Sequence, residues 1–260
     1  MMDEIQTYLG ADGLMHCTVC KEPVEAFYPK GSLLEMKKHH RQCACERQAY
    51  AEEAQYFKEK ERRELVVRNK KICFEEKEME GFTFQNVDRD SSAIRIAEEY
   101  VANWQKMKQN HMGYLFWGPV GTGKSYLACA LGHEACKRGF RTFYANAPKL
   151  PGALKVAKVK GTLETELKKI ERCQLLILDD LFIVPLDARE RPILLEIIED
   201  RHERKSVIIT SQYPSSNWYD MVGDPTIADA ILDRIIHTAH TIELYGESMR
   251  KLRSKKNEKY

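Results

Sequence analysis

Residues 116–128 read FWGPVGTGKSYLA, with three glycines and a proline between an apolar run and a Lys-Ser pair. Residues 118–125 match the pattern G-x-x-x-x-G-K-[S/T], which surrounds phosphate groups when a strand precedes it and a helix follows it. Glycine lets main-chain N–H groups turn toward phosphate oxygens with no Cβ in the way, and the N-terminus of the next helix attracts negative charge. The stretch therefore predicts a phosphate-binding loop.

Nine residues form the nucleotide site that this loop predicts. We expect Lys124 to reach the β and γ phosphates of ATP and the Ser125 hydroxyl to bind Mg²⁺. The full set is Gly118, Pro119, Val120, Gly121, Thr122, Gly123, Lys124, Ser125 and Tyr126.

An apolar segment, LLILDD at 175–180, ends in two carboxylates. Carboxylates at the end of a buried strand are costly unless a cation lies beside them, so this strand end is expected to face the phosphate loop. Asp179 would support Mg²⁺, and Asp180 would polarise the water that attacks the γ-phosphate.

A second apolar segment, VIITSQ at 207–212, also ends in polar residues. Gln212, or Ser211 beside it, could contact the γ-phosphate and the attacking water. The alternative is an ordinary polar strand end with no part in the chemistry.

From residue 113 onward the sequence alternates between apolar strands and helices. This alternation predicts an α/β fold in which helices cover both faces of a parallel sheet. Ahead of it, Ser91 is expected to cap a helix that runs to about residue 109 and is apolar on one face. We expect strands at 113–118, 141–147, 174–181 and 206–214, and helices at 124–139, 162–173 and 190–205.

The composition of the 260 residues limits the class of protein. Apolar residues make up 43%, enough for a core, and the net charge of +2 gives no overall basic field, so any contact with nucleic acid must come from local patches. No apolar run approaches the length of a membrane span, and the N-terminus lacks the pattern of a signal peptide. We therefore expect a cytoplasmic protein whose eight cysteines are metal ligands or buried thiols.

Four of these cysteines, Cys17, Cys20, Cys43 and Cys45, form two close pairs near the N-terminus. Two pairs separated by a loop suit a tetrahedral Zn²⁺ ion, which would stabilise a fragment too small to fold alone. Because the second pair is the tight C-x-C, a histidine could replace one thiolate; the candidates are His16, His39 and His40. Unrelated buried or redox-active thiols are the alternative.

The segment after Cys45 is dense in Glu, Lys and Arg and contains no proline, which predicts a long exposed helix ending at Gly81. It separates the cysteine-rich start from the α/β pattern. We accordingly expect four parts: a zinc-binding module at 1–48, a charged helical linker at 49–81, an ATPase domain at 82–250 and a basic tail at 251–260.

Residues from about 82 to 250 resemble the AAA+ ATPases of the bacterial DnaC/DnaI helicase-loader and IstB transposition-helper group. The stretches that carry the resemblance are GPVGTGKS, LLILDDL, LLEIIEDRHERKSVIITSQYP, GDPTIADAILDRIIHTAHTIEL and GESMR. The resemblance implies a AAA+ P-loop NTPase that hydrolyses ATP with Mg²⁺ and assembles as an ATP-dependent homo-oligomer, with nucleotide at the subunit interfaces.

The same resemblance assigns roles to two arginines and marks two departures. Arg234 is at the position of the arginine that completes a neighbouring subunit's site, although it could instead pair on the surface with Asp229 or Asp233. Arg250 is a weaker candidate for a phosphate sensor. The family often has glycine where this chain has Phe182, and many AAA+ proteins have Glu in place of Asp180, so water activation could be slower.

The cysteine-rich start resembles the front module of DnaI-type loaders, which grips the replicative helicase, whereas the C-terminal half looks closer to IstB. The combination favours a protein that loads or remodels a replicative helicase on single-stranded DNA. The alternatives are an IstB-like helper that acts on duplex DNA with a transposase, and an adaptor that senses ATP but hydrolyses it weakly.

A lysine-rich segment between the second and third expected strands is the candidate DNA contact. In this clade it faces the centre of the oligomer, where lysines follow phosphates without reading sequence. Phe143 and Tyr144, just before it, are expected in the core. The lysines are Lys149, Lys155, Lys158 and Lys160, of which the last three are the main candidates.

Overall fold

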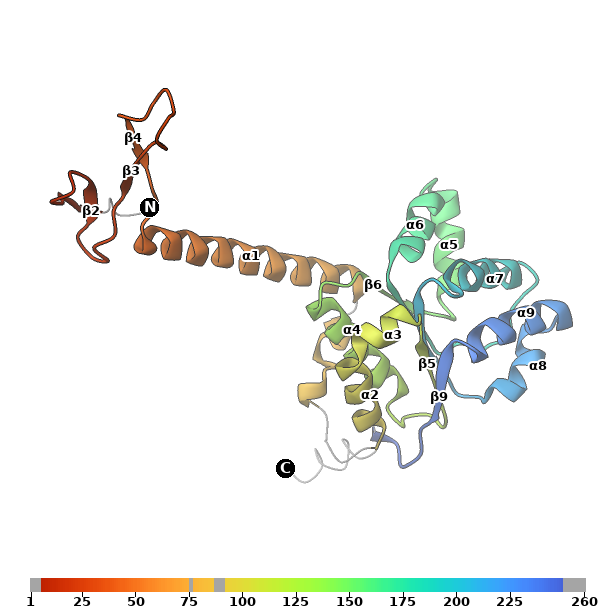
Figure 1. Cartoon of the computed structure of the whole chain (residues 1–260). Helices are drawn as coiled ribbons and strands as arrows, with labels where there is room; N and C mark the ends of the chain where they lie inside the picture. Colours follow the sequence, from red (N-terminus) through yellow and green to blue (C-terminus); the bar gives the residue numbers. More distant parts are fainter. Residues whose placement is uncertain (1–5, 75–76, 87–91, 250–260) are drawn as a thin grey trace. The chain divides into compact units, whose positions relative to one another are not determined.

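The computed structural model describes residues 6–74, 77–86 and 92–249 (Figure 1). The chain divides into two compact units, residues 1–64 and 65–260. None of the described helices combines the length and apolar character that a membrane span needs.

Unit 1 begins with two small antiparallel sheets that the sequence did not predict. Strand β1 (Thr7–Leu9) pairs with β2 (Met15–Cys17), and β3 (Glu25–Phe27) pairs with β4 (Lys38–His40). Each strand has three residues, too few to show a periodic pattern. The buried residues here are Cys17, Val24 and Cys43.

A long charged helix, α1 (Ala44–Cys73), follows as expected, but it ends eight residues before the predicted Gly81. Its last turn is held in unit 2, where the Asn69 side chain donates to the Phe140 carbonyl at 3.2 Å. Cys73 and Phe74 are buried in an apolar cluster with Cys129 and Cys136. This burial ends the helix, and the 3₁₀ turn η1 (Lys77–Gly81) replaces the predicted continuation.

Unit 2 contains a five-stranded, all-parallel sheet with the order β6-β7-β8-β5-β9 (Figure 1). The predicted α/β fold with a parallel sheet is therefore confirmed. The sequence missed β9, in which polar and charged residues hide an edge strand. The strands are β5 (Gly113–Trp117), β6 (Thr142–Asn146), β7 (Leu175–Asp179), β8 (Ser206–Ser211) and β9 (Ala239–Glu243).

The three helices predicted between the strands are present as α4 (Lys124–Lys137), α6 (Leu163–Arg172) and α7 (Glu190–Arg201). The predicted helix before β5 is divided into α2 (Ser92–Ala102) and α3 (Trp104–Gln109). Its expected cap, Ser91, lies outside the described residues.

Several further elements were not predicted. A Pro-Gly pair hides α5 in the sequence, although proline is tolerated in the first turn of a helix, where its missing N–H has no partner to lose. These elements are η2 (Phe84–Asn86), α5 (Leu150–Val159), η3 (Ser215–Asn217), α8 (Trp218–Val222) and α9 (Pro225–Ile236).

Helices cover both faces of the sheet (Figure 1), and their apolar side chains pack against it. On one face, Ile94, Ala97, Tyr100 and Trp104 pack with α4 and with Ile177 of β7, as the one-sided pattern predicted. On the other face, α6, α7 and α9 pack against alternate residues of β7 and β8. Since both faces are buried, the central strands β5, β7 and β8 are mainly apolar, whereas the edge strands β6 and β9 carry more polar residues.

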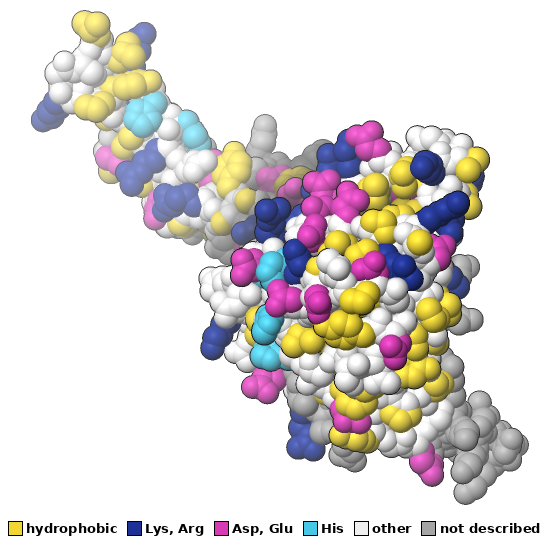
Figure 2. Space-filling model, turned by 90° about the vertical axis from the view of Figure 1, so that its right-hand side faces the viewer, with side chains coloured by type: hydrophobic (Ala, Val, Ile, Leu, Met, Phe, Trp, Pro, Cys, Tyr) yellow, Lys and Arg dark blue, Asp and Glu magenta, His cyan; other side chains and the backbone are white. Residues whose placement is uncertain are grey.

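Charges of both signs are mixed over the surface. On the face shown in Figure 2, Lys and Arg side chains lie among Asp and Glu side chains, with apolar side chains between them. This distribution agrees with the small net charge of +2 and shows no single-sign field on that face.

Candidate functional site

The predicted phosphate loop joins β5 to α4. Gly118, Gly121 and Gly123 adopt φ angles of 138°, 83° and 97°, which L side chains rarely adopt. A Cβ at Gly118 would lie 2.3 Å from the Leu244 carbonyl oxygen, and one at Gly121 would lie 2.2 Å from the Ser248 Oγ. Glycine is thus favoured at all three positions by main-chain conformation, and close packing also requires it at Gly118 and Gly121.

Lys124, the first residue of α4, points back into this loop. Its Nζ donates to the Gly118 and Pro119 carbonyl oxygens, at 2.7 Å each, and the residue is 5% exposed. Thr122 Oγ1 also donates to the Pro119 carbonyl. The ammonium group and the N-terminus of α4 lie at one place, which is a physical requirement for holding a phosphate.

The segment after β9 packs on the phosphate loop, a contact that the sequence did not reveal. The Leu244 N–H donates to the Trp117 carbonyl at 2.8 Å, and the Met249 N–H donates to the Gly121 carbonyl at 2.9 Å. These two bonds, at either end of residues 244–249, hold that segment along the loop. Arg250, the candidate phosphate sensor, lies outside the described residues.

The Asp179 carboxylate is buried at the end of β7, with 3% of the residue exposed. Tyr144 on β6 donates its hydroxyl to Oδ2 at 2.7 Å, and Thr210 on β8 donates its hydroxyl to Oδ1 at 2.6 Å. The Thr210 oxygen in turn accepts the Asp180 N–H at 2.8 Å. The two strands that flank β7 therefore both orient the carboxylate proposed for Mg²⁺.

Tyr144 and Thr210 are the site residues that the sequence did not identify. Tyr144 was expected in the core; burial and the charge of Asp179 raise its pKa well above the usual value, so the phenol stays protonated and donates. Thr210 precedes the predicted candidates Ser211 and Gln212 and is fully buried. Its polar side chain inside an otherwise apolar strand is the signal that could have found it.

Asp180 and Phe182 follow β7 and both adopt a φ of 58°. The left-handed region costs roughly 1–2 kcal/mol for a residue with a Cβ, less for aspartate. Glycine takes this conformation without strain, whereas Phe182 is buried against Trp218, with ring centroids 4.9 Å apart. The burial of its ring offsets the strain.

The remaining predicted catalytic residues are Gln212, which follows β8 at the end of the sheet where the phosphate loop lies, and Arg234. Gln212 is half-buried just past the end of β8, and Ser211 Oγ accepts the Tyr213 N–H at 3.2 Å. Arg234, near the end of α9, pairs with Glu199 of α7 at 2.8 Å. The alternative pairing with Asp229 or Asp233 is thus replaced by one with Glu199.

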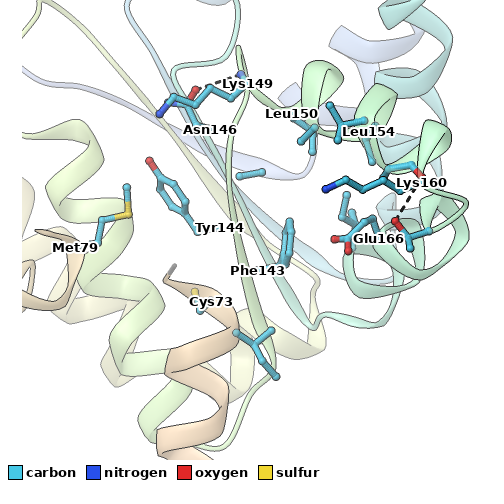
Figure 3. A pocket seen from close by; sticks show the side chains of 17 residues that line it. Cys73, Met79, Phe143, Tyr144, Asn146, Lys149, Leu150, Leu154, Lys160 and Glu166 are labelled. Atoms are coloured by element: carbon cyan, nitrogen blue, oxygen red, sulfur yellow. Dashed lines mark hydrogen bonds between the residues drawn. The ribbon is translucent and has the colours of Figure 1, made fainter. Parts of the chain in front are cut away.

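The lysines predicted to contact DNA lie on or beside α5. Lys155 is close to two carboxylates, at 3.6 Å from Asp187 and 4.0 Å from Glu190. Lys158 is exposed, whereas Lys149 and Lys160 line a cavity beside β6 (Figure 3).

The four N-terminal cysteines converge in unit 1. The sulfur atoms of Cys17, Cys20, Cys43 and Cys45 all lie within 4.8 Å of one another. A tetrahedral zinc with Zn–S bonds of about 2.3 Å separates its sulfur ligands by about 3.8 Å, so the cluster could bind zinc with small adjustments.

The candidate histidine ligands are engaged in other contacts. His16 contacts Asp12 at 3.0 Å through Nε2, and its Nδ1 lies 3.0 Å from the Lys21 carbonyl. His39 Nδ1 contacts the carbonyl of His40, whose own Nε2 lies 3.2 Å from Glu46. The geometry therefore favours the four thiols as ligands.

The thiols of the cluster do not ionise alike. Main-chain N–H groups of Cys45 and Glu22 lower the pKa of Cys20 to about 6. The contact between the two thiols raises the pKa of Cys45 to about 12. Four thiolates at such short distances repel one another, so a cation is what would let all of them ionise together. The donor set fits a soft divalent metal.

With these two sites described, comparison with known proteins identifies the family. A model described as IstB-like ATP binding protein matches residues 47–257. The chain belongs to this family. The matched residues contain the phosphate loop, and all four cysteines of the cluster precede them.

Individual relatives are described as insertion sequence ATP-binding proteins. An insertion sequence ATP-binding protein of Sinorhizobium fredii, y4uH, is 47% identical over 166 residues, which are 64% of each chain. The ATP-binding protein of insertion sequence IS21 from Pseudomonas aeruginosa is 36% identical over 133 residues, 51% of this chain and 50% of that protein. The matched parts thus span less than two thirds of these curated relatives' own length.

Solved structures share the fold of this IstB-like protein. DnaI is 25% identical with a TM-score of 0.59, covering 66% of this chain and 96% of that one. The DnaC helicase loader is 22% identical with a TM-score of 0.57, covering 65% of this chain and 100% of that one. The likeness confirms the AAA+ P-loop fold, and the resemblance to the DnaC/DnaI and IstB group is confirmed with it.

The first prediction concerns Lys124. We expect Lys124→Ala to weaken ATP binding by at least about 30-fold, because truncating one partner of a buried charge contact costs about 2–5 kcal/mol. Calorimetry with ATP measures this, and Lys158→Ala, which removes an exposed lysine, serves as the control. ATP affinity equal to that of the unmodified protein would exclude Lys124 from the site.

The second prediction concerns the Tyr144–Asp179 bond. Tyr144→Phe is expected to lower the free energy of unfolding by about 1.5–3 kcal/mol, the usual value of a hydrogen bond to a charged group. Urea denaturation followed by circular dichroism measures it. Tyr245→Phe is the matched control, because it removes an exposed bond to Glu243, and it should leave the midpoint unchanged. Equal midpoints for both variants would show that the buried bond adds nothing.

The third prediction concerns the cysteine cluster. The purified protein is expected to contain about one zinc per chain, since four thiolates form one structural site. Cys43→Ser should lose this zinc, and Cys129→Ser, which changes a buried cysteine of unit 2, should keep it. Elemental analysis by mass spectrometry gives the ratio; zinc retained in Cys43→Ser would contradict the assignment.

Proposed function

We propose that this protein is a Mg²⁺-dependent ATPase that assists the transposition of an insertion sequence. The observation that supports ATP hydrolysis is that the Asp179 carboxylate and the phosphate loop both lie at the carboxyl ends of the strands. The similarity to insertion sequence ATP-binding proteins supports the biological setting. Because its eight cysteines are not joined in disulfides, we propose that it acts in the cytoplasm.

Each side chain of the site has a distinct task in ATP hydrolysis. The loop N–H groups and Lys124 would bind the β and γ phosphates, while Ser125 and Asp179 would hold Mg²⁺, which neutralises phosphate charge. Asp180, with Gln212, would orient the attacking water, and the Asp180 carboxylate would accept its proton as the water attacks. Tyr144 and Thr210 hold the Asp179 carboxylate in place through their hydroxyl groups.

We propose that the active form is an ATP-dependent homo-oligomer in which Arg234 acts on the nucleotide of the neighbouring subunit. Arg234 is only partly exposed, with 27% of its side chain accessible, and its Glu199 partner is half exposed. A surface ion pair of this kind contributes little to folding stability. Arg234 can therefore exchange Glu199 for a phosphate group in an assembly at a small free-energy cost.

DNA is the proposed substrate of this assembly. Lys155, Lys158 and Lys160 follow one another along α5 and its end, and their contacts with phosphates would be independent of sequence. Lys155 would have to exchange its nearby carboxylates, Asp187 and Glu190, for phosphate oxygens.

A helicase loader is the second candidate function. The observation that favours it is the cysteine cluster, which lies ahead of the residues matched by the IstB-like model. The proposed zinc module would bind a replicative helicase, and the ATPase unit would act on single-stranded DNA. The fold likeness to DnaC and DnaI is compatible with this function, but it extends to the fold alone.

One comparison of binding partners separates the two functions. The full-length protein, with ATP and Mg²⁺, is titrated against duplex DNA, single-stranded DNA, the host's replicative helicase and an insertion sequence transposase. Tight binding to duplex DNA and the transposase supports the transposition helper. Binding to the helicase that is lost on zinc chelation supports the loader, and ATP binding with negligible turnover in every mixture would indicate an ATP-sensing adaptor.

The fourth prediction tests Arg234. Arg234→Ala should keep ATP affinity and lose turnover, and arginines of this kind contribute on the order of 10³–10⁵ in the rate of GTPases. Mixing it with Lys124→Ala should restore part of the activity, because some interfaces then combine an intact loop with an intact arginine. Glu199→Gln is the control: it removes the ion pair within the chain and should remain active. A Glu199→Gln variant as inactive as Arg234→Ala would reduce Arg234 to a structural role.

A further inference from the structure

Strand β6 forms one edge of the described sheet, and its pairing leaves main-chain groups directed outward. The Ala147 N–H donates to the Asp179 carbonyl at 2.8 Å, and the Arg141 carbonyl accepts the Leu175 N–H at 3.3 Å. A parallel strand uses every second residue toward one neighbour, so the odd-numbered residues bond to β7. The N–H and C=O groups of Thr142 and Tyr144 therefore face away from the sheet.

A cavity of about 370 Å³ lies along this edge (Figure 3). It extends to both sides of β6: Tyr144 lies toward Cys73 and Met79 on one side, and Phe143 lies toward Leu154 of α5 on the other. The side chains of an extended strand point alternately to opposite sides. The two sides of the cavity thus match the two sets of side chains that an added strand would carry.

The sequence of β6, TFYAN, contains no charged residue and no proline. Natural edges are blunted by charged side chains, proline or bulges. The opposite edge strand, β9, carries His240 and Glu243 and is more exposed along its length. The contrast singles out β6 as the edge that is suited to a partner strand.

Charge at the rim of the cavity specifies the partner further. Lys149 and Lys160 line it together with one carboxylate, Glu166 (Figure 3). The excess of positive charge favours an acidic group on the occupant. The rest of the lining is apolar or neutral, which favours aliphatic or aromatic side chains.

We propose that the β6 edge binds an extended, mainly apolar peptide segment of a partner protein, which adds to the sheet as a strand and brings an acidic side chain to Lys149 or Lys160. Single-stranded DNA fits less well, because it needs exposed aromatic faces and a row of cations rather than outward main-chain groups between two apolar walls. This site lies beside Tyr144, so its occupant would contact a residue bonded to Asp179. It adds a partner site to the proposed function and does not depend on ATP hydrolysis.

The test uses the full-length protein and a phage-displayed library of short random peptides as the probe. Enriched peptides are synthesised, and their affinity is measured by fluorescence anisotropy for the unmodified protein and three variants. Ala153→Trp fills the cavity from an exposed position of α5. Lys160→Glu reverses a rim charge just after α5, and Lys158→Glu is the matched control, because it makes the same change two residues earlier and outside the cavity lining.

We expect the library to yield apolar peptides with an acidic residue. Ala153→Trp should reduce the affinity for these peptides at least about tenfold, and Lys160→Glu about fivefold or more. Lys158→Glu should leave the affinity unchanged. Hydrogen–deuterium exchange should slow at residues 142–146 when the peptide binds, because the Tyr144 N–H gains an acceptor. An unselective library, equal affinity for Ala153→Trp, or unchanged exchange at β6 would overturn the proposal. Single-stranded DNA could instead slow exchange at residues 142–146. If Lys158→Glu and Lys160→Glu then weakened DNA binding equally, the edge would be assigned to nucleic acid.

ATP binding, measured on the same preparation, separates this proposal from the proposed function. A protein that binds ATP but selects no peptide would refute the peptide site alone. A protein that selects the peptides but binds no ATP would refute the ATPase and leave the peptide site standing.

Discussion

The buried carboxylate of Asp179 is the constraint on which much of unit 2 depends. A charge removed from water costs several kcal/mol unless hydrogen bonds replace the lost hydration. Its two donors, Tyr144 and Thr210, belong to the strands on either side. Both bonds require the observed register, in which Asn146 pairs with Asp179 and Leu178 pairs with Ile209. A slip by one residue would turn both hydroxyl groups to the other face of the sheet and leave the charge without donors.

The same register extends to the phosphate loop. Strand β8 pairs with β7 on one side and with β5 on the other, and β5 leads into the loop. Beyond β5, the parallel strand β9 continues into residues 244–249, whose main chain bonds to Trp117 and Gly121. Gly118 packs so closely on Leu244 that a side chain is excluded. The loop is thus held from behind by a segment more than a hundred residues later in the chain, which gives that segment a direct influence on the nucleotide site.

The two units differ in what stabilises them. Unit 2 has a sheet covered by helices on both faces, and its apolar cores are large enough to stabilise it. The cysteine-rich part of unit 1 buries few side chains, so we attribute its stability to the proposed metal. The IstB-like family match begins at residue 47, after the last cysteine of the cluster. The chain therefore joins an IstB-like domain to a cysteine-rich module that holds a candidate metal site.

The sequence by itself determined the phosphate loop, the α/β class, the main strands and the pairing of two cysteine motifs, because each depends on local spacing or on periodicity. It missed β9, α5 and the four strands of unit 1, where short length, polar residues or a Pro-Gly pair hide the pattern. It also placed the end of α1 too late, since burial of Cys73 and Phe74 ends that helix. Only the tertiary structure showed that Tyr144 and Thr210 donate hydrogen bonds to Asp179 and that Arg234 pairs with Glu199. It also showed that β6 is an edge strand of the sheet. These depend on which strands are neighbours, and strand order is set by packing of the whole sheet rather than by any local stretch of sequence.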